Sequence, residues 1–179
     1  VLADGTACTC TFQAFKVKQG QRVILNSGCA AMGYGFPAAV GAAFALNGER
    51  VICLEGDGSL QLNIQELQTM KYYNLPIKLF IYANAGYHSI RTTQETYFNA
   101  RYVASNAASG VSAPDFLKIA KAYGIPAFEI KNTEELDKVP RVLEGRSPTI
   151  CVIQMDPRQP LIPKGRGEKL PDGKIRSKP

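Results

Sequence analysis

The sequence predicts an α/β fold in which a parallel sheet of about six strands carries helices on both faces. Short apolar, partly β-branched runs, such as residues 51–54 and 77–83, are typical of buried strands. Helical patterns alternate with these runs, and no internal repeat is present. The chain has 179 residues, 45% of them hydrophobic and 20% charged, which suits one globular domain with a sizeable core.

Local signals place the elements along the chain. The expected strands are residues 1–3, 22–25, 51–54, 77–83, 127–130 and 149–154. The expected helices are residues 8–17, 37–46, 63–73, 86–94, 116–123 and 132–143. The second helix has proline in its first turn and Asn47-Gly48 at its end, and its apolar composition predicts that it is buried. Ser112 opens a capping box before the fifth helix, and Asn132 is the expected N-cap of the sixth.

Residues 156–179 form a basic, Pro- and Gly-rich tail beyond a first domain of residues 1–155. The tail holds seven Lys/Arg and three Asp/Glu, so it supplies +4 of the net charge of +6. It lacks the interleaved aromatic residues on which single-stranded nucleic acids stack. We therefore expect a solvated or partner-covering tail and no nucleic-acid ligand.

Composition also indicates the setting of the protein. No apolar run approaches the roughly 20 residues that span a bilayer, and no export signal is visible. We therefore expect a cytoplasmic protein with no membrane partner. The five cysteines show no metal-site spacing, and we expect Cys8 and Cys10 to be buried structural thiols.

Two strand ends carry the residues with the most evident chemistry. Asp57 follows the run at 51–54 between two glycines, and Asn84 follows the run at 77–83. The two strand ends are expected to lie close together, so that a carboxylate and an amide oxygen face one spot. Mg²⁺ prefers such oxygen ligands and often keeps positions for phosphate. Gly56 and Gly58 would let the backbone approach that phosphate, and the N–H groups of the following helix would point at it.

The order Gly-Asp-Gly-Ser at 56–59, then Asn84 and Gly86, resembles the thiamine-diphosphate signature of the acetolactate synthase and pyruvate decarboxylase superfamily. The resemblance covers roughly residues 1–154. It implies that Mg²⁺ is held on the cofactor diphosphate by the side chains of Asp57 and Asn84 and the carbonyl of Gly86. Many members have a second Asn where this chain has Ala83, which is not the ligand position.

The same resemblance implies further cofactor contacts. Met32 matches the large apolar residue that wedges between the two rings of the cofactor, with its own N–H and the carbonyl of Ala30 serving the pyrimidine; simple core filling is the alternative for Met32. Thr6 matches a loop that touches the diphosphate from the other side. The remaining expected cofactor residues are Gly56, Gly58, Ser59 and Tyr87.

Residues 86–94, with Tyr97-Phe98, look like the acetolactate synthase branch. Pyruvate decarboxylases carry a catalytic Glu where this chain has Ile90. His88 is the single histidine of the chain and our catalytic candidate, because its ordinary pKa suits proton transfer near neutral pH. A surface or helix-capping histidine is the alternative.

The resemblance implies decarboxylation of a 2-keto acid followed by carboligation, with the cofactor as electron sink. In the family, the glutamate that activates the cofactor comes from a separate pyrimidine-binding domain, usually of another subunit. We therefore expect this chain to be inactive alone and to be the C-terminal part of a larger, homo-oligomeric enzyme. A separately encoded small subunit of a two-chain 2-keto acid decarboxylase is the alternative.

Two other classes stay open. A non-catalytic ligand-binding or regulatory α/β domain would explain the sheet, but it has no need of Met32, Asp57 and Asn84 together. A phosphate hydrolase could use Asp57 with Mg²⁺, but it would need further carboxylates or a nucleophile. We interpret Glu66 as an ordinary exposed or capping helix residue.

Overall fold

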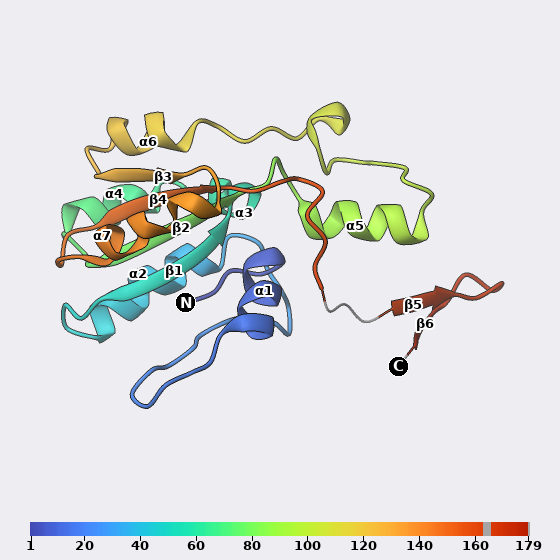
Figure 1. The fold of residues 1–179 in the computed structure, drawn as a ribbon, viewed down its shortest axis with the longest axis horizontal. Coiled ribbons are helices and arrows are strands. Elements are labelled where there is room, and N and C mark those ends of the chain that lie inside the picture. The colour runs from blue at the N-terminus through green and yellow to red at the C-terminus, as the bar shows by residue number, and fades with distance from the viewer. Residues whose placement is uncertain (163–165, 179) are drawn as a thin grey trace.

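Four parallel strands form the central sheet of the computed structural model, which describes residues 1–162 and 166–178. They are β1 (Val51–Gly56), β2 (Ile77–Ala83), β3 (Ala127–Ile130) and β4 (Thr149–Gln154), in the order β1-β2-β4-β3. The helices are α1 (Thr6–Ala14), α2 (Gly35–Ala45), α3 (Asp57–Leu60), α4 (Glu66–Tyr72), α5 (His88–Tyr97), α6 (Phe116–Ala122) and α7 (Val139–Leu143), with 3₁₀ turns η1 (Gln61–Asn63), η2 (Ala107–Ser109) and η3 (Thr133–Lys138). The carboxyl ends of the strands share one edge of the sheet, the edge on which α3 and α5 lie (Figure 1). The predicted α/β class is confirmed.

The prediction of about six strands is wrong, because two N-terminal segments pair too briefly to form ladders. Leu2 makes one isolated parallel bridge to Leu54 at the free edge of β1. Its N–H donates to the carbonyl of Ile24 (2.9 Å), so residues 22–25 lie beyond Leu2 in the same direction. Residues 23–25 are only half-buried. A strand without a buried face has little to fix its register.

Helices cover both faces of the sheet, as predicted. On one face α2, α4 and α6 pack around buried residues that include Phe36, Met70 and Ile81. On the other face α7 packs against β4 and β3, where Phe80 and Val142 are buried. Both faces of the sheet are thus buried under helices.

Two helix predictions need correction. α2 is buried on one face only: Phe44 is 48% exposed and meets Tyr73 edge-on, with ring centroids 5.1 Å apart. The cap of α6 is Asp115, whose carboxylate accepts from two backbone N–H groups, rather than Ser112. Asn132 caps η3, as predicted, although the helix that follows is split into η3 and α7.

Side chains that were expected in the core are partly accessible on α1. Cys8 and Cys10 are half-buried rather than buried. Within the part of the chain that the structure describes, no three His, Cys, Asp or Glu side chains gather as a metal site, and no helix has the length and apolarity to cross a membrane.

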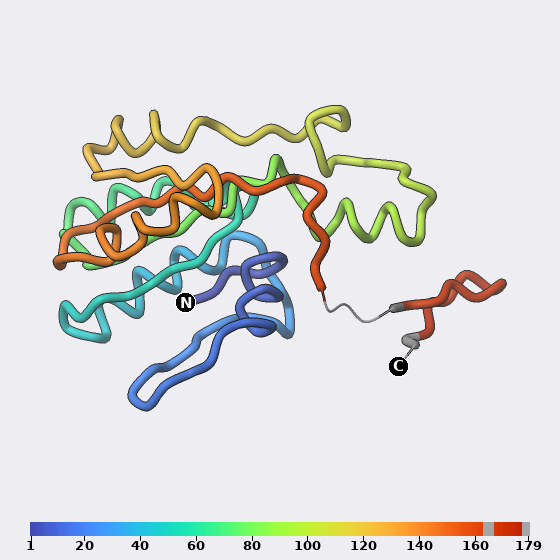
Figure 2. Tube along the Cα trace, viewed as in Figure 1, coloured from blue at the N-terminus to red at the C-terminus, as the bar shows by residue number. Residues whose placement is uncertain are grey.

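The tail contains a two-stranded hairpin that was not among the expected strands. Figure 2 shows the chain leaving β4, running past α5 and turning in a hairpin, in which β5 (Arg166–Lys169) pairs antiparallel with β6 (Ile175–Lys178). The turn passes through Pro171, Asp172 and Gly173, and Gly173 has a φ of 84°, which glycine adopts without steric cost. Residues 163–165 and 179 of the predicted tail lie outside the described residues.

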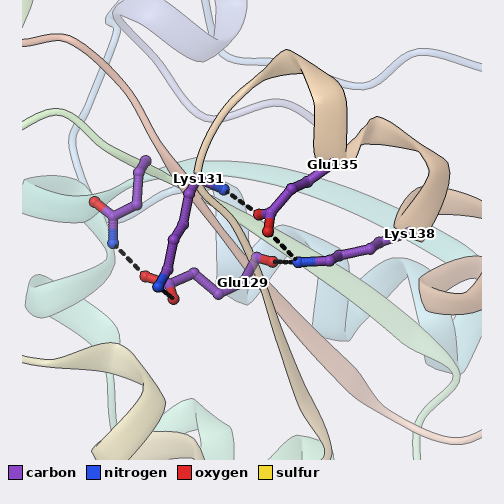
Figure 3. A network of polar contacts seen from close by, with 5 residues as sticks. Glu129, Lys131, Glu135 and Lys138 are labelled. Carbon is purple, nitrogen blue, oxygen red and sulfur yellow. Dashed lines mark hydrogen bonds and ion pairs between the residues drawn. The ribbon is translucent and has the colours of Figure 1, made fainter.

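A network of charged side chains fastens the end of β3 to the segment that follows (Figure 3). Glu135 accepts from the backbone N–H of Lys131 (2.8 Å) and pairs with Lys138 (2.8 Å). Lys138 also donates to the carbonyl of Glu129 (3.2 Å), and Glu129 pairs with Lys131 (3.5 Å). Because these side chains are partly exposed, solvent screens the ion pairs and they add little stability; the network mainly joins the end of β3 to η3.

The central strand β2 carries a buried lysine. Lys78 is 1% exposed, and its ammonium donates to the carbonyls of Glu144 (2.7 Å) and Ser147 (2.9 Å) and to the hydroxyl of Thr149 (3.1 Å). An ammonium has three donors, and all three find acceptors here. Lys78 therefore ties the loop after α7 to the middle of the sheet.

Buried polar groups fasten the loop before α2 to the end of β1 and to α3. Glu55 is fully buried and accepts from the backbone N–H of Phe36 (2.9 Å), near the start of α2. Ser59 accepts from the N–H of Gly33 (2.8 Å), and the carbonyl of Gly33 accepts from the amide of Asn63 (2.7 Å). The loop that carries the predicted cofactor residues before α2 is thus held at the carboxyl edge of the sheet.

The buried carboxyl of Glu55 predicts a pH dependence of stability. Burial raises its pKa from 4.5 to about 7, and the nearby Asp4 carboxyl acts in the same direction. Between these two values the folded protein holds a proton that the unfolded chain has lost. The free energy of unfolding therefore falls as pH rises through this window, by roughly 1.4 kcal/mol per pKa unit.

We predict that Glu55→Gln removes this slope. In metal-free protein, the wild type should lose roughly 2–4 kcal/mol of unfolding free energy relative to the variant as the pH rises from about 4.5 to about 8. Urea denaturation at a series of pH values measures this difference. Parallel pH profiles for the two proteins would contradict the prediction.

Candidate functional site

The carboxylate of Asp57 joins the ends of β1 and β2 through hydrogen bonds. These strands are parallel neighbours, with Gly56 paired to Tyr82, so the residues that follow them meet. One carboxylate oxygen of Asp57 accepts from the backbone N–H of Asn84 (3.0 Å) and of Gly86 (3.2 Å), and the other accepts from the N–H of Gly58 (2.7 Å). The expectation that the two strand ends lie close together is confirmed.

Burial and hydrogen bonding act on Asp57 in opposite directions. The residue is 2% exposed, and burial raises the pKa of its carboxyl. Hydrogen bonds from the N–H groups of Gly86, Gly58 and Asn84 partly offset that rise. A cation beside the carboxylate would also favour its charged form.

The side chain of Asn84 has an unsatisfied atom. Asn84 is 5% exposed, and among the residues that the structure describes its Oδ1 is the buried side-chain atom without a hydrogen-bond partner. Leaving a buried amide oxygen unpaired costs about 1–3 kcal/mol. The carbonyl of Gly86, two residues on, accepts from the N–H of His88 (3.1 Å) and keeps a second lone pair. This oxygen set therefore fits a hard cation.

One cavity of about 270 Å³ gathers every residue that the sequence assigned to a cofactor, metal or catalytic role. These residues are Thr6, Ala30, Met32, Gly56, Asp57, Gly58, Ser59, Asn84, Gly86, Tyr87 and His88. They come from the start of α1, the loop before α2, the β1–α3 junction and the β2–α5 junction. Asp4, Ser89 and Ile90 also line the cavity and were not assigned to it. Asp4 accepts from the hydroxyl of Ser59 (3.4 Å), a contact that no local sequence signal reveals.

The loop before α2 brings Ala30 and Met32 to the rim of this cavity. Met32 is 39% exposed, so it does not fill the core. Ala30 has a φ of 49°, a left-handed conformation that costs a residue with a Cβ about 1–2 kcal/mol. Strain of this kind concentrates at functional sites.

Thr6 and His88 meet across the cavity. The hydroxyl of Thr6 lies 3.1 Å from Nδ1 of His88, and His88 is 8% exposed. The alternative of a surface histidine is therefore wrong, although His88 does open α5. Tyr87 places its ring so close to Gly58 that a Cβ at that position would clash with it. Only glycine fits at position 58 beside this ring.

A second, larger cavity of about 630 Å³ also includes Asp57 in its lining. It is formed by the ends of β2, β3 and β4, the start of α6 and the segment that contains Met155 and Pro157. Apart from Asp57 it contains none of the predicted site residues. Glu66 lies in the first turn of α4 and lines neither cavity.

Comparison with known proteins agrees with this geometry. Residues 4–153 match the family model described as thiamine pyrophosphate enzyme, C-terminal TPP binding domain. The chain is 37% identical over 158 residues to the acetolactate synthase large subunit of Cyanidium caldarium, covering 86% of this chain and 26% of the relative. It is 42% identical over 125 residues to that of Porphyra purpurea, covering 70% and 21%.

A bacterial relative gives the same picture. The large subunit of acetolactate synthase isozyme 2 of Escherichia coli strain K12 is 34% identical over 149 residues, which cover 81% of this chain and 27% of the relative. The chain thus spans about a quarter of the length of the curated relatives it matches. The match over residues 4–153 shows that the chain belongs to the thiamine pyrophosphate enzyme family, as a C-terminal TPP-binding domain.

Proposed function

We propose that this chain binds thiamine diphosphate through Mg²⁺ and forms one half of the active site of an acetolactate synthase-like enzyme. The observation that carries the proposal is the buried, unpaired Oδ1 of Asn84, a residue that lines the same cavity as Asp57 and whose backbone N–H donates to the Asp57 carboxylate. With the carbonyl of Gly86 these atoms form an all-oxygen ligand set of the kind that Mg²⁺ takes, with positions left for phosphate oxygens.

The charge of the cavity supports the need for a metal. Among the described residues, its lining includes the carboxyl groups of Asp57 and Asp4 and no Lys or Arg. A diphosphate would meet repulsion in such a site unless a divalent cation lay between the two anions. Backbone N–H groups at the start of α3 other than that of Gly58 would orient the phosphates, together with the hydroxyl of Thr6, whose proton is free when Nδ1 of His88 is the donor. The hydroxyl of Ser59 already donates to Asp4.

The size and contents of the cavity support a half-site. Its volume of about 270 Å³ lies below the roughly 300–1,000 Å³ of typical small-molecule sites. No glutamate lines it, and the buried Glu55 is bonded to the backbone of Phe36 instead. The glutamate that the family uses to activate the pyrimidine would then come from a pyrimidine-binding domain, supplied by another subunit of a homo-oligomer.

The other residues of the cavity would act on the cofactor rings and on the substrate. Met32 would hold the two cofactor rings in their bent shape, and the carbonyl of Ala30 would accept from the pyrimidine amino group. His88, held by Thr6, would move a proton at the substrate. The bound cofactor supplies the electron sink for decarboxylation of a 2-keto acid and carboligation.

We predict that Asp57→Ala abolishes Mg²⁺-dependent binding of thiamine diphosphate, because it removes the anionic ligand. Asn84→Ala should also weaken binding, yet it should leave the stability of the metal-free protein unchanged or slightly higher, because it deletes an unpaired buried oxygen. Titration calorimetry of the full-length protein and urea denaturation measure the two effects. Asp115→Ala, a carboxylate of the other cavity, is the matched control. Wild-type affinity in Asp57→Ala would refute the assignment.

We predict that Met32→Ala lowers turnover of the full-length enzyme more than it lowers cofactor affinity, because the diphosphate stays anchored while the rings lose their support. The control is Met70→Ala, which empties a fully buried position and should cost about 2–5 kcal/mol of stability without a specific loss per folded molecule. Steady-state kinetics, cofactor titration and thermal melts separate the two patterns. A Met32→Ala enzyme that is less stable but fully active when folded would exclude the wedge role.

A further inference from the structure

Arg91 is a buried cation in α5, the helix that follows residues 84–86. We call residues 84–86 the metal turn, because they include the proposed ligands Asn84 and Gly86. Arg91 is 6% exposed, and none of the ion pairs between described residues includes it. Burying a guanidinium is costly unless hydrogen bonds replace its water. The hydrogen-bond acceptors of its guanidinium therefore indicate what Arg91 does in the fold.

All of those partners are backbone carbonyls. One terminal nitrogen of Arg91 donates to the carbonyl of Asn84 (2.9 Å) and to that of Pro157 (3.0 Å). The other donates to the carbonyl of Ala85 (3.1 Å) and to that of Ser105 (3.3 Å). The four hydrogens on these two nitrogens match the four carbonyls. Each nitrogen thus joins the turn at 84–85 to a distant segment of the chain.

The turn at 84–86 is therefore held from two sides. The carboxylate of Asp57 accepts from the N–H groups of Asn84 and Gly86, and Arg91 donates to the carbonyls of Asn84 and Ala85. Within the turn Ala85 has a φ of 62° and Gly86 a φ of 114°. A backbone in these sparsely populated regions persists only where the surroundings enforce it. The direction of the Asn84 side chain and of the Gly86 carbonyl depends on that backbone.

Arg91 also links the turn to the place where the chain leaves the sheet. Ala85 and Pro157 both line the second cavity, which also includes Asp57. A shift of the turn would change the distance from Arg91 to Asn84 and Ala85, and through the shared nitrogens it would change the contact with Pro157. Coupling between two such places is reciprocal, so a ligand that fixes one also stabilises the other.

We propose that Arg91 is a positioning residue that sets the geometry of the metal turn and couples occupancy of that turn to the order of the chain around Pro157. The proposal rests on the proposed function, because it concerns the same metal site. A merely structural Arg91 would affect stability alone. A positioning Arg91 affects metal affinity per folded molecule and transmits metal binding to residues 156–162.

The test uses the full-length protein with Mn²⁺ as a paramagnetic probe and saturating thiamine diphosphate. Arg91→Met should weaken Mn²⁺ binding roughly 10- to 100-fold, the loss typical of removing a group that orients metal ligands. Arg101→Met is the matched control, since Arg101 is an exposed arginine shortly after the same helix, and it should bind Mn²⁺ as the wild type does. Titration by electron paramagnetic resonance gives the affinities.

Hydrogen exchange gives the second readout. In the wild type, Mn²⁺ and thiamine diphosphate should slow exchange in the peptide that covers residues 156–162, and in Arg91→Met this protection should be lost even at saturating Mn²⁺. Unchanged Mn²⁺ affinity in Arg91→Met would overturn the proposal. So would a wild-type exchange rate in that peptide that is the same with and without Mn²⁺ and thiamine diphosphate.

Arg91→Lys keeps the test decisive if the methionine variant does not fold. Lysine retains the charge but carries its donors on one nitrogen, so it cannot join both pairs of carbonyls. It should fold and still bind Mn²⁺ several-fold more weakly, and wild-type affinity would overturn the proposal. Asp57→Ala separates the two hypotheses: if the wild type binds Mn²⁺ no better than Asp57→Ala, the proposed function fails, whereas binding that depends on Asp57 but not on Arg91 refutes only the positioning role.

Discussion

The carboxylate of Asp57 is the constraint on which the rest of the site depends. Its two oxygens accept hydrogen bonds from three backbone N–H groups, one at the start of α3 and two in the turn after β2. Because the bonds from Asn84 and Gly86 join the turn after β2 to the residue that follows β1, they fix the separation of the strand ends and the path of the turn. The position of the Asn84 side chain, of the Gly86 carbonyl and of the Tyr87 ring over Gly58 follows from that path.

The same region concentrates features that lower stability in the absence of ligand. Oδ1 of Asn84 is buried and unpaired, Glu55 is fully buried, and both Ala30 and Ala85 have left-handed backbones. Elsewhere the described chain satisfies its buried polar groups, as the three bonds of Lys78 show. Left-handed residues also occur away from the site, at Ala100 and Ala104 for example, so the unpaired Oδ1 of Asn84 is the feature that marks this edge as the place where a ligand supplies a missing interaction.

The sequence predicts which residues meet at the carboxyl edge better than it predicts the number of strands. Asp57 and Asn84 follow parallel strands, and strand ends at one edge of a sheet can be paired from pattern alone. Residues 22–25 have the composition of a strand but no buried face to fix a ladder, and composition does not reveal burial. The partners of Arg91 are carbonyls up to 66 positions away, and those of Lys78 lie 66 to 71 positions away, so no local pattern signals either residue.

The central claim is that Asp57, Asn84 and the carbonyl of Gly86 form a metal site on a cofactor diphosphate. The most direct measurement is a crystal structure of the full-length protein with Mn²⁺ and thiamine diphosphate, in which anomalous scattering locates the metal. The account predicts one Mn²⁺ at about 2.0–2.3 Å from a carboxylate oxygen of Asp57, from Oδ1 of Asn84 and from the Gly86 carbonyl, with diphosphate oxygens completing its shell. A Mn²⁺ in the second cavity, or a diphosphate bound with Oδ1 of Asn84 left unpaired, would contradict it.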